Sequence, residues 1–357
     1  MKKYLLPVSL IFLTLLFLFG GYRIYQDRTK EITTLNIAEF ECSLLHIPMY
    51  IALKENFFGD YNIRVKYKTT SPDDFYLAKG AGQADVVIGE TVQCLFTKPS
   101  DIRNNWLCFT GITNSSGYFL LAHDSMPGFK WEDIKGKTVI AGPPENSGEL
   151  ILEGIVREKG LRPLHDFNIL WNIPENLKIG AFKAGTASYI LVKEPLATIV
   201  KNEKQGTIVS ALGVEAGEIP EVVLVARKNF AKENRTVIQG VTNSIYKAQI
   251  WMGYHNSREI AHKVKDYFPK VNKKVLEEAI ERHLEQATWA LTPLVQENSY
   301  EKLQEITRLG GELYGTVPFE DEVDTQYAKQ STSTVEYIPE DKREKKYPQD
   351  FLRILSK

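Results

Sequence analysis

The hydrophobic positions of this chain recur with two periods, and the two periods alternate along most of its length. Residues 62–67 place Ile63, Val65 and Tyr67 on one face, which is the period of two that is typical of a strand. Elsewhere apolar residues return every three or four positions, as on one face of a helix. The pattern predicts strands over 35–40, 62–67, 85–88, 106–112, 137–141, 167–171, 189–192 and 221–227. It predicts helices over 48–58, 73–79, 146–159, 175–183, from 195 onward, and over 237–254, 257–267, 273–288 and 299–314.

The predicted elements form two similar sets. The segment 78–85 (AKGAGQAD) resembles the segment 181–188 (AFKAGTAS), and in both a helix ends at Gly-x-Ala before an apolar strand. We therefore expect two copies of one βαβ unit, which make an α/β fold with two lobes and a cleft between them. The predicted division gives residues 32–121 and 223–317 to lobe 1 and residues 122–222 to lobe 2. Ligands of such sheets bind beyond the carboxyl ends of the strands, so the loops there are expected to face the cleft.

The N-terminus differs from the rest of the chain. Lys2 and Lys3 precede an uncharged stretch over 4–22, long enough to cross a bilayer as a helix, and the lysines favour a cytoplasmic N-terminus. A cleaved signal peptide begins in the same way, but Gly20 and Gly21 follow two large residues and make a poor cleavage site. We predict that residues 1–25 are a transmembrane anchor, or else a signal segment. Either alternative places the body at the extracytoplasmic face of the cell membrane.

Composition narrows the class of protein. The chain has 357 residues, with 44 basic and 45 acidic side chains, and this balance argues against a nucleic-acid partner. The segment 318–357 is charged and polar and is predicted to be a flexible tail, in which residues 349–355 are compatible with one short helix. The three cysteines, Cys42, Cys94 and Cys108, are interpreted as small buried side chains, with a Cys42–Cys94 bridge as the alternative. We expect no metal and no cofactor.

The loops after the predicted strands supply the candidate site. The candidate ligand-binding residues are His46, Glu90, Thr91, Ser115, Ser116, Ser147, Gly148, Trp171 and Glu194. Several have structural alternatives: Asn146 or Ser147 can cap a helix, the two glutamates favour helix N-termini, and Trp171 can cover the edge of the core. No catalytic residue is predicted, because the chain contains none of the common nucleophile, metalloprotease or phosphate-loop motifs.

Three segments resemble a known family. Residues 47–58 (IPMYIALKENFF), residues 82–88 (GQADVVI) and the run from Gly185 to Glu194-Pro195 resemble motifs of the ABC-importer binding proteins that include the sulfonate, nitrate, taurine and thiamine-pyrimidine binders (SsuA/THI5-like). The resemblance covers about residues 35–314. It implies a type II periplasmic-binding-protein fold, a monomer, and an ABC permease with its ATPase as partners. Ser188 departs from the usual Asp, no lipid-attachment cysteine follows the apolar segment, and the tail has no clear counterpart.

The charges of the predicted cleft loops bear on the ligand. These loops carry Glu41, Glu90, Glu145, Glu175 and Glu194 but only one base, Lys193. Small strong anions often recruit Arg or Lys, so we expect a neutral or amine-bearing ligand, for example a pyrimidine-like ring, rather than a sulfonate, nitrate or taurine. A membrane-tethered sensory or accessory module is the alternative function. A thiamine-pyrimidine biosynthetic enzyme is less favoured, because the cysteine-rich cluster of those enzymes is missing from this sequence.

Overall fold

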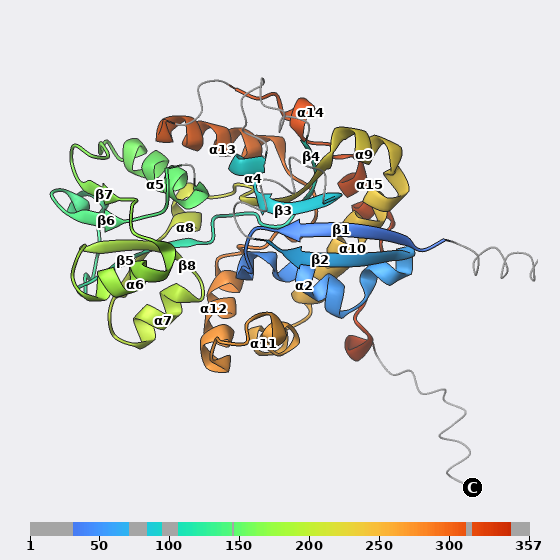
Figure 1. Cartoon of the computed structure of the whole chain (residues 1–357), viewed down its shortest axis with the longest axis horizontal. Coiled ribbons are helices and arrows are strands. Elements are labelled where there is room, and N and C mark those ends of the chain that lie inside the picture. Colours follow the sequence, from blue (N-terminus) through green and yellow to red (C-terminus); the bar gives the residue numbers. More distant parts are fainter. Residues whose placement is uncertain (1–30, 71–83, 95–105, 145, 312–315, 344–357) are drawn as a thin grey trace, which may run out of the picture.

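The computed structural model describes residues 31–70, 84–94, 106–144, 146–311 and 316–343. Within these ranges the chain forms two five-stranded sheets, each covered by helices (Figure 1). The α/β two-lobed architecture predicted from the repeat is therefore confirmed. The predicted helix over 73–79 lies outside the described residues, as does the predicted N-terminal anchor. No helix among the described residues is long and apolar enough to cross a membrane.

The two sheets share one topology, which confirms the predicted duplication. In lobe 1 the order is β2 (Ile63–Thr69), β1 (Thr33–Glu39), β3 (Val86–Glu90), β10 (Val222–Arg227) and β4 (Trp106–Gly111). In lobe 2 the order is β7 (Asn168–Leu170), β6 (Thr138–Ile140), β8 (Tyr189–Lys193), β5 (Tyr118–Ala122) and β9 (Thr207–Ala211). In each sheet the first three strands are parallel and the fourth is antiparallel to its neighbours.

The fourth strand of each sheet comes from a chain crossover. β5 enters lobe 2 directly after lobe 1, and β10 returns to lobe 1 after lobe 2. The boundary predicted at residues 121 and 122 is therefore placed too late, because β5 pairs with β8 and β9 inside the second sheet. The crossovers run over 112–117 and 212–221 and lie side by side, since Ile219 N–H donates to the Asn114 carbonyl at 3.0 Å.

Helices pack against both sheets to build the cores. Lobe 1 carries α2 (Ile47–Lys54), α9 (Lys228–Glu233), α10 (Arg235–Gly253), α11 (Ser257–Val264) and α12 (Lys273–Glu285), and lobe 2 carries α5 (Ser147–Glu158), α6 (Glu175–Lys183), α7 (Leu196–Asn202) and α8 (Leu212–Ala216). The predicted helix over 48–58 is shorter in the structure, because Asn56 adopts a left-handed conformation (φ 55°) after α2. A single-turn helix, α4 (Thr91–Cys94), follows β3.

The helix α13 (Glu297–Gly310) joins the two lobes along the top of Figure 1. Its residue Tyr300 packs in a lobe 1 cluster with Cys108, whereas Leu303 and Ile306 pack in the core of lobe 2. The contact with α5 is close because Gly154 has no side chain: a Cβ there would lie 2.6 Å from the Ile306 carbonyl oxygen. Residues 297–310 were assigned to lobe 1, but this helix belongs to both cores.

The C-terminal segment is packed rather than free over 316–343, which corrects the prediction of a flexible tail. It forms α14 (Phe319–Glu322) and α15 (Gln326–Thr334). Tyr327 is 4% exposed and lies edge-on to Phe109 in lobe 1. Asp341 accepts a hydrogen bond from His255 at 2.9 Å. Apolar residues inside the charged sequence thus complete the surface of lobe 1; residues 344–357, with the predicted short helix over 349–355, lie outside the described residues.

Candidate ligand-binding cleft

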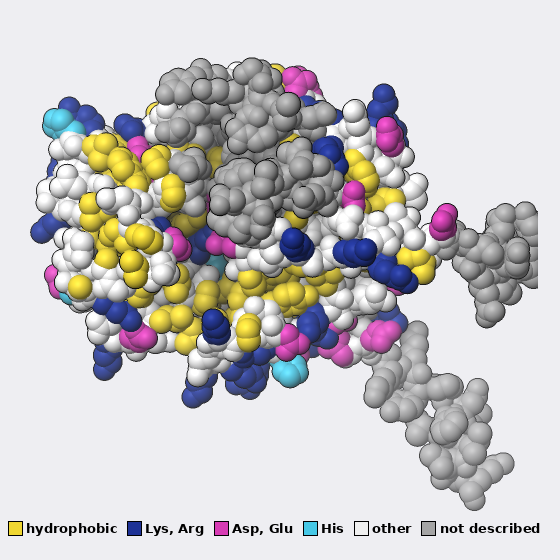
Figure 2. All heavy atoms as spheres, viewed as in Figure 1, with side chains coloured by type: hydrophobic (Ala, Val, Ile, Leu, Met, Phe, Trp, Pro, Cys, Tyr) yellow, Lys and Arg dark blue, Asp and Glu magenta, His cyan; other side chains and the backbone are white. Residues whose placement is uncertain are grey.

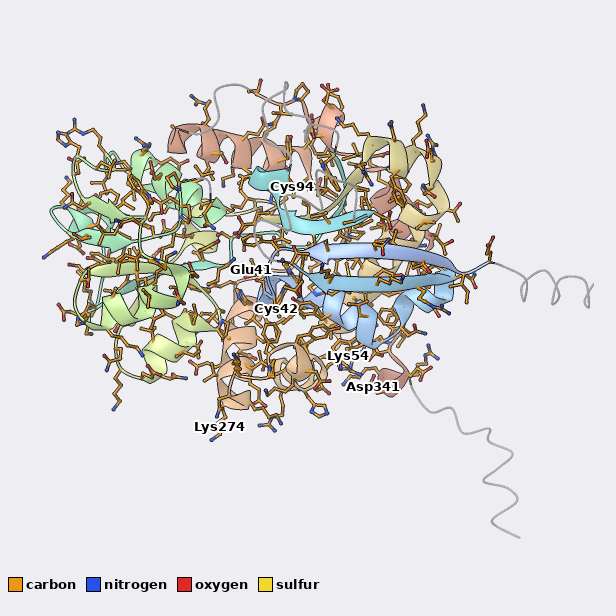
Figure 3. All side chains as sticks on the ribbon, viewed as in Figure 1. Glu41, Cys42, Lys54, Cys94, Lys274 and Asp341 are labelled. Atoms are coloured by element: carbon orange, nitrogen blue, oxygen red, sulfur yellow. The ribbon has the colours of Figure 1, made fainter. Side chains whose placement is uncertain are left out.

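Charged and polar groups of both lobes meet at the carboxyl ends of the parallel strands. Lobe 1 contributes Glu41, which follows β1, and Glu90, which ends β3. Lobe 2 contributes Lys193, which ends β8, Ser147, which begins α5, and Tyr118, which begins β5. Figure 3 labels Glu41 at the junction of the lobes, and Figure 2 shows acidic and basic side chains meeting there. The topology therefore assembles this site from segments far apart in the sequence.

Lys193 links the lobes through two carboxylates. Its ammonium forms an ion pair with Glu41 and lies 3.7 Å from Glu90 Oε1. Burial alone lowers the pKa of Lys193, but the charges of Glu41 and Glu90 outweigh burial and hold that pKa well above its usual range. Burial likewise opposes ionisation of Glu41, and the ammonium of Lys193 nevertheless keeps the pKa of Glu41 below its usual range. Both groups are therefore charged at neutral pH.

Glu90 receives further donors from lobe 2. Ser147 N–H, at the N-terminus of α5, donates to Glu90 Oε2 at 3.1 Å. The Tyr118 hydroxyl lies 3.2 Å from Glu90 Oε1 and 2.9 Å from Asn146 Oδ1, so its one proton serves one of the two acceptors at a time. A carboxylate at a helix N-terminus is favoured by the unpaired N–H groups and the helix dipole. The Glu90 carboxylate of lobe 1 thus lies against a part of lobe 2 that suits an anionic group.

A second carboxyl group lies at the crossover beside Glu90. Glu221 is fully buried, and its Oε2 accepts a hydrogen bond from Gly117 N–H at 2.8 Å. Burial and the neighbouring charge of Glu90 raise the pKa of Glu221 to about 7. Its Oε1 atom has no hydrogen-bond partner among the described residues. The site is therefore rich in acceptors on the lobe 1 side.

A small cavity lies at this junction among the described residues. A cavity of about 20 Å³ is lined by Phe40, Glu41, Ser43, Leu45, His46, Ile88, Gly89, Glu90, Lys193 and Val222. That volume accommodates about one water molecule. The lobes contact each other at this junction, and a ligand bound here has to replace the contacts that Lys193 and Glu90 make between the lobes.

His46 also lines this cavity, and the buried carboxylate of Glu39 holds its imidazole ring. Its Nδ1 lies 2.8 Å from Glu39 Oε2. Glu39 also accepts hydrogen bonds from Tyr50 at 2.8 Å, Tyr67 at 2.5 Å and Thr69 at 2.6 Å. Burial raises the pKa of Glu39, but these donors, with His46 the strongest, outweigh burial and hold that pKa below its usual range. The network fixes the orientation of the imidazole at the floor of the cleft.

Three predicted residues hold the crossovers rather than line the cavity. Thr91 is buried, donates through Oγ1 to the Pro220 carbonyl, and donates through its N–H to the Glu221 carbonyl at 2.8 Å. Ser116 is buried, and its Oγ accepts from Tyr118 N–H at 3.4 Å. Ser115 Oγ has no partner among the described residues and lies next to Gly213 of the other crossover.

The first turn of α5 agrees with the predicted helix cap. Asn146 Oδ1 accepts from Gly148 N–H at 2.9 Å, so this N–H is already satisfied within the helix start. Gly148 instead provides space, because a Cβ there would lie 2.4 Å from the ring of Tyr118. Ser147 Oγ is buried and has no partner among the described residues, and Ser147 N–H faces Glu90. Of the two residues, Ser147 is the one whose N–H contacts Glu90 across the junction of the lobes.

Trp171 and Glu194 lie outside the cavity lining. Trp171 Nε1 donates to Glu149 Oε1 at 3.2 Å. Glu194 accepts from Thr198 N–H at 2.9 Å and from Thr198 Oγ1 at 2.8 Å, which caps α7. It also lies 3.2 Å from Arg282 Nε of α12, so it joins lobe 2 to lobe 1 at a second place.

Sequence reasoning named His46, Glu90 and Ser147 but missed the contributions of Tyr118 and Glu221. Glu41 and Lys193 were noted as loop charges, not as partners. Their positions in the sequence could have indicated these two residues. Tyr118 follows the polar run 113–117, and Glu221 immediately precedes an apolar strand. Both residues flank crossovers, which in a duplicated two-lobed fold lie next to the cleft.

Two duplicated α/β lobes, two adjacent crossovers and a polar junction between the lobes define a periplasmic-binding-protein fold. Residues 126–265 match the model of the NMT1-like family. YtlA of Bacillus subtilis (strain 168), whose name assigns it to the binding proteins, is 27% identical over 305 residues, which cover 85% of this chain and 91% of that protein. The resemblance stated from the sequence motifs is thus confirmed.

Solved structures share the same fold. The alkanesulfonate-binding protein SsuA from Xanthomonas axonopodis pv. citri, bound to MOPS, matches with a TM-score of 0.66 at 14% identity, covering 83% of this chain and 100% of that chain. A zinc-bound ligand-binding component of an ABC-type import system from Staphylococcus aureus matches with a TM-score of 0.66 at 13% identity, covering 84% and 99%. The desulfurization enzyme DSZB also matches, with a TM-score of 0.62 at 11% identity, covering 85% and 99%. The fold alone therefore does not separate binding from catalysis.

Proposed function

We propose that this protein is the extracytoplasmic solute-binding component of an ABC importer, tethered to the membrane by its N-terminal segment. It captures a small molecule between its lobes and presents the closed form to a permease and its ATPase. A ligand that binds the closed form better than the open form shifts the population towards closure. The observation that carries the proposal is the interlobe contact of Lys193 with Glu41 and Glu90, at the place where ligands of this architecture bind.

The same contact supports an amine-bearing ligand over a small strong anion such as nitrate. Glu41 and Glu90 pair with one base, Lys193, and Glu221 lies beside Glu90, so the junction offers more acceptors than positive charge. A protonated amine gains charge-assisted hydrogen bonds from such carboxylates. A strong anion without an amine meets their repulsion instead.

Binding is favoured over cysteine-based catalysis by the state of the thiol nearest the cleft. Desolvation and the charges of Glu39 and Glu41 raise the pKa of Cys42 to about 11. The thiolate, not the thiol, is the nucleophile, so Cys42 is a poor one at neutral pH. Cys42 is exposed rather than buried as predicted and forms no disulfide with Cys94, and its Sγ lies 3.3 Å from the Tyr267 carbonyl oxygen as a weak donor.

A thermal-shift screen of the full-length protein in mild detergent tests the proposal. The panel contains sulfonates, nitrate, amines, pyrimidines and riboflavin. A ligand at one hundred times its dissociation constant stabilises the folded state by about 2.7 kcal/mol. We expect an amine-bearing compound to raise the melting temperature of the wild type but not of Glu90→Gln, with Glu203→Gln on an exposed ion pair of lobe 2 as the control. Capture in this cleft is contradicted if no compound of the panel raises the melting temperature. It is also contradicted if the best binder stabilises Glu90→Gln as much as the wild type.

A further inference from the structure

The two faces of the cleft are chemically opposite. Lobe 1 presents acceptors, the carboxylates of Glu41 and Glu90, whereas lobe 2 presents donors, the Lys193 ammonium, the Tyr118 hydroxyl and Ser147 N–H. In the structure each face satisfies the other. The protein's own ammonium and carboxylates therefore mark where positive and negative groups are stabilised.

Two buried atoms are left over and repeat this polarity. Ser147 is the first residue of the 12-residue helix α5 and is 1% exposed. Its Oγ atom has no hydrogen-bond partner among the described residues. Its hydroxyl can donate beside Ser147 N–H, where the helix N-terminus favours negative charge. Glu221, fully buried on the crossover side near Glu90, interacts with Gly117 N–H and the Ser116 side chain, but its Oε1 atom has no partner within hydrogen-bond distance among the described residues. A ligand with one acceptor end and one donor end uses both atoms.

A ligand that carries only one charge leaves one face unsatisfied. The cavity of about 20 Å³ is too small for an organic molecule, so a ligand bound at this place replaces the Lys193 contacts. A simple amine then satisfies the carboxylates but faces Lys193 as a like charge. A simple acid satisfies Lys193 and α5 but faces Glu41 and Glu90. Removing one partner from a poorly solvated ion pair is strongly destabilising.

We propose that the cleft selects a small zwitterion, with its protonated amine between Glu41 and Glu90 and its acid group between Lys193 and the N-terminus of α5. The inference rests on the proposed function and names the class of solute. In this structure the Lys193 ammonium lies where the amine would bind, and the Glu90 carboxylate lies where the acid would bind. The acid is a carboxylate or a sulfonate, since both present the acceptor oxygens that these donors require. An amino-sulfonate such as taurine, which the loop charges alone argued against, is included because its amine satisfies the carboxylates.

Calorimetry on the full-length protein with matched compounds tests the selection. The zwitterions are β-alanine and taurine, the amine is propylamine, and the acids are propanoate and ethanesulfonate. We expect one zwitterion to bind at least about ten-fold tighter than propylamine and than its own matched acid. β-Alanine as the tighter binder assigns a carboxylate, and taurine assigns a sulfonate. The proposal is overturned if a singly charged compound binds as tightly as its zwitterion, or if neither zwitterion binds at about 10 mM.

Two charge-removing variants give a crossed pattern that nonspecific damage does not produce. Lys193→Met weakens the zwitterion and strengthens propylamine, whereas Glu90→Gln weakens the zwitterion and strengthens the matched acid. Lys183→Met and Glu203→Gln, which remove the same charges from an exposed ion pair within lobe 2, leave the preferences unchanged. Parallel losses for all compounds in both cleft variants contradict the assignment.

The outcome separates this inference from the proposed function. A pyrimidine amine without an acid group that binds the wild type and loses affinity in Glu90→Gln overturns the zwitterion but leaves solute capture in place. Failure of every compound, including the larger screening panel, contradicts both.

Discussion

Gly148 shows how a single residue sets the shape of the cleft. A Cβ at this position would lie 2.4–2.6 Å from three atoms of the Tyr118 ring, so alanine forces the ring away from α5. We expect Gly148→Ala to destabilise the protein by about 1–3 kcal/mol through overpacking, and to weaken ligand binding because Tyr118 faces Glu90. Gly180→Ala in α6 is the matched control: nothing lies within 4 Å there, and helix propensity predicts a gain of about 0.5–1 kcal/mol. Urea unfolding of both variants measures the difference, and equal effects contradict the packing argument.

Glu149 ties stability to pH. Burial, with the nearby charge of Glu153, raises the pKa of Glu149 to about 8. In the unfolded chain a glutamate titrates near pH 4.3, so the folded state holds a proton that the unfolded state has lost. The contribution is fully present below the unfolded pKa and is lost as pH rises through about 8, at up to about 1.4 kcal/mol per pH unit. Glu149→Gln should therefore flatten the decline in unfolding free energy between about pH 5 and pH 8. An unchanged slope contradicts a protonated Glu149.

The sequence predicted some of these residues because their roles are local. Asn146 as a helix cap follows from the order of residues alone, and Glu90 follows from the end of a predicted strand. The pairing of Lys193 with Glu41 does not follow, because 152 positions separate the two residues and only the assembled lobes bring them together. The sequence therefore identifies the charged side chains, but only the folded structure shows which of them form ion pairs.

At the scale of elements, α12 forms a second contact between the lobes. This helix packs in the core of lobe 1, yet its Glu278 accepts from Lys201 at 2.6 Å and from Asn202 at 2.8 Å on α7. Arg282 of α12 lies 3.2 Å from the buried carboxylate of Glu194. These pairs exist only when the lobes are close, so they stabilise the closed form without touching the ligand.

Removal of this contact tests its role in closure. A partly exposed ion pair contributes about 0.2–1 kcal/mol, so Glu278→Gln should lower ligand affinity by at most about five-fold. Small-angle scattering should show a larger radius of gyration for the ligand-free variant. Among the described residues Glu277 of the same helix pairs with Lys273 and Arg258 of lobe 1, so Glu277→Gln serves as the control. If Glu278→Gln has the ligand affinity and radius of gyration of the control, the contact between α12 and α7 does not stabilise closure.

The strands that the sequence missed also have a physical explanation. β5 (Tyr118–Ala122) is buried along its whole length, so it lacks the alternation that identifies a half-buried strand. β9 (Thr207–Ala211) is only partly buried and short. The parallel strands were recognisable because each is followed by a turn or helix start that repeats in the other lobe. Local pattern thus predicts the duplicated unit and the returning strand β10, but not β5, the strand exchanged at the first crossover.

At the scale of the molecule, the C-terminal segment is part of lobe 1. Tyr327 is buried beside Phe109, and its hydroxyl lies 3.4 Å from the Ala231 carbonyl. We expect Tyr327→Ala to cost about 3–5 kcal/mol of unfolding free energy, as for other large aromatic truncations. Tyr254→Ala, at a tyrosine that is 48% exposed, should change it by less than about 0.5 kcal/mol. Similar unfolding midpoints for the two variants would contradict the packing of the C-terminal segment on lobe 1 and would support the flexible tail predicted from its charged composition.

Capture by both lobes is tested most directly by hydrogen–deuterium exchange with the best compound from the binding screen. Because the solute is held where Glu41 and Glu90 face Lys193 and Ser147, saturation should slow amide exchange together over 41–46 and 89–91 in lobe 1 and over 146–150 and 193–198 in lobe 2. The crossovers at 112–117 and 212–221 should slow as well, since closure restrains them. Protection confined to one lobe, or centred on a surface away from this junction, would contradict the account.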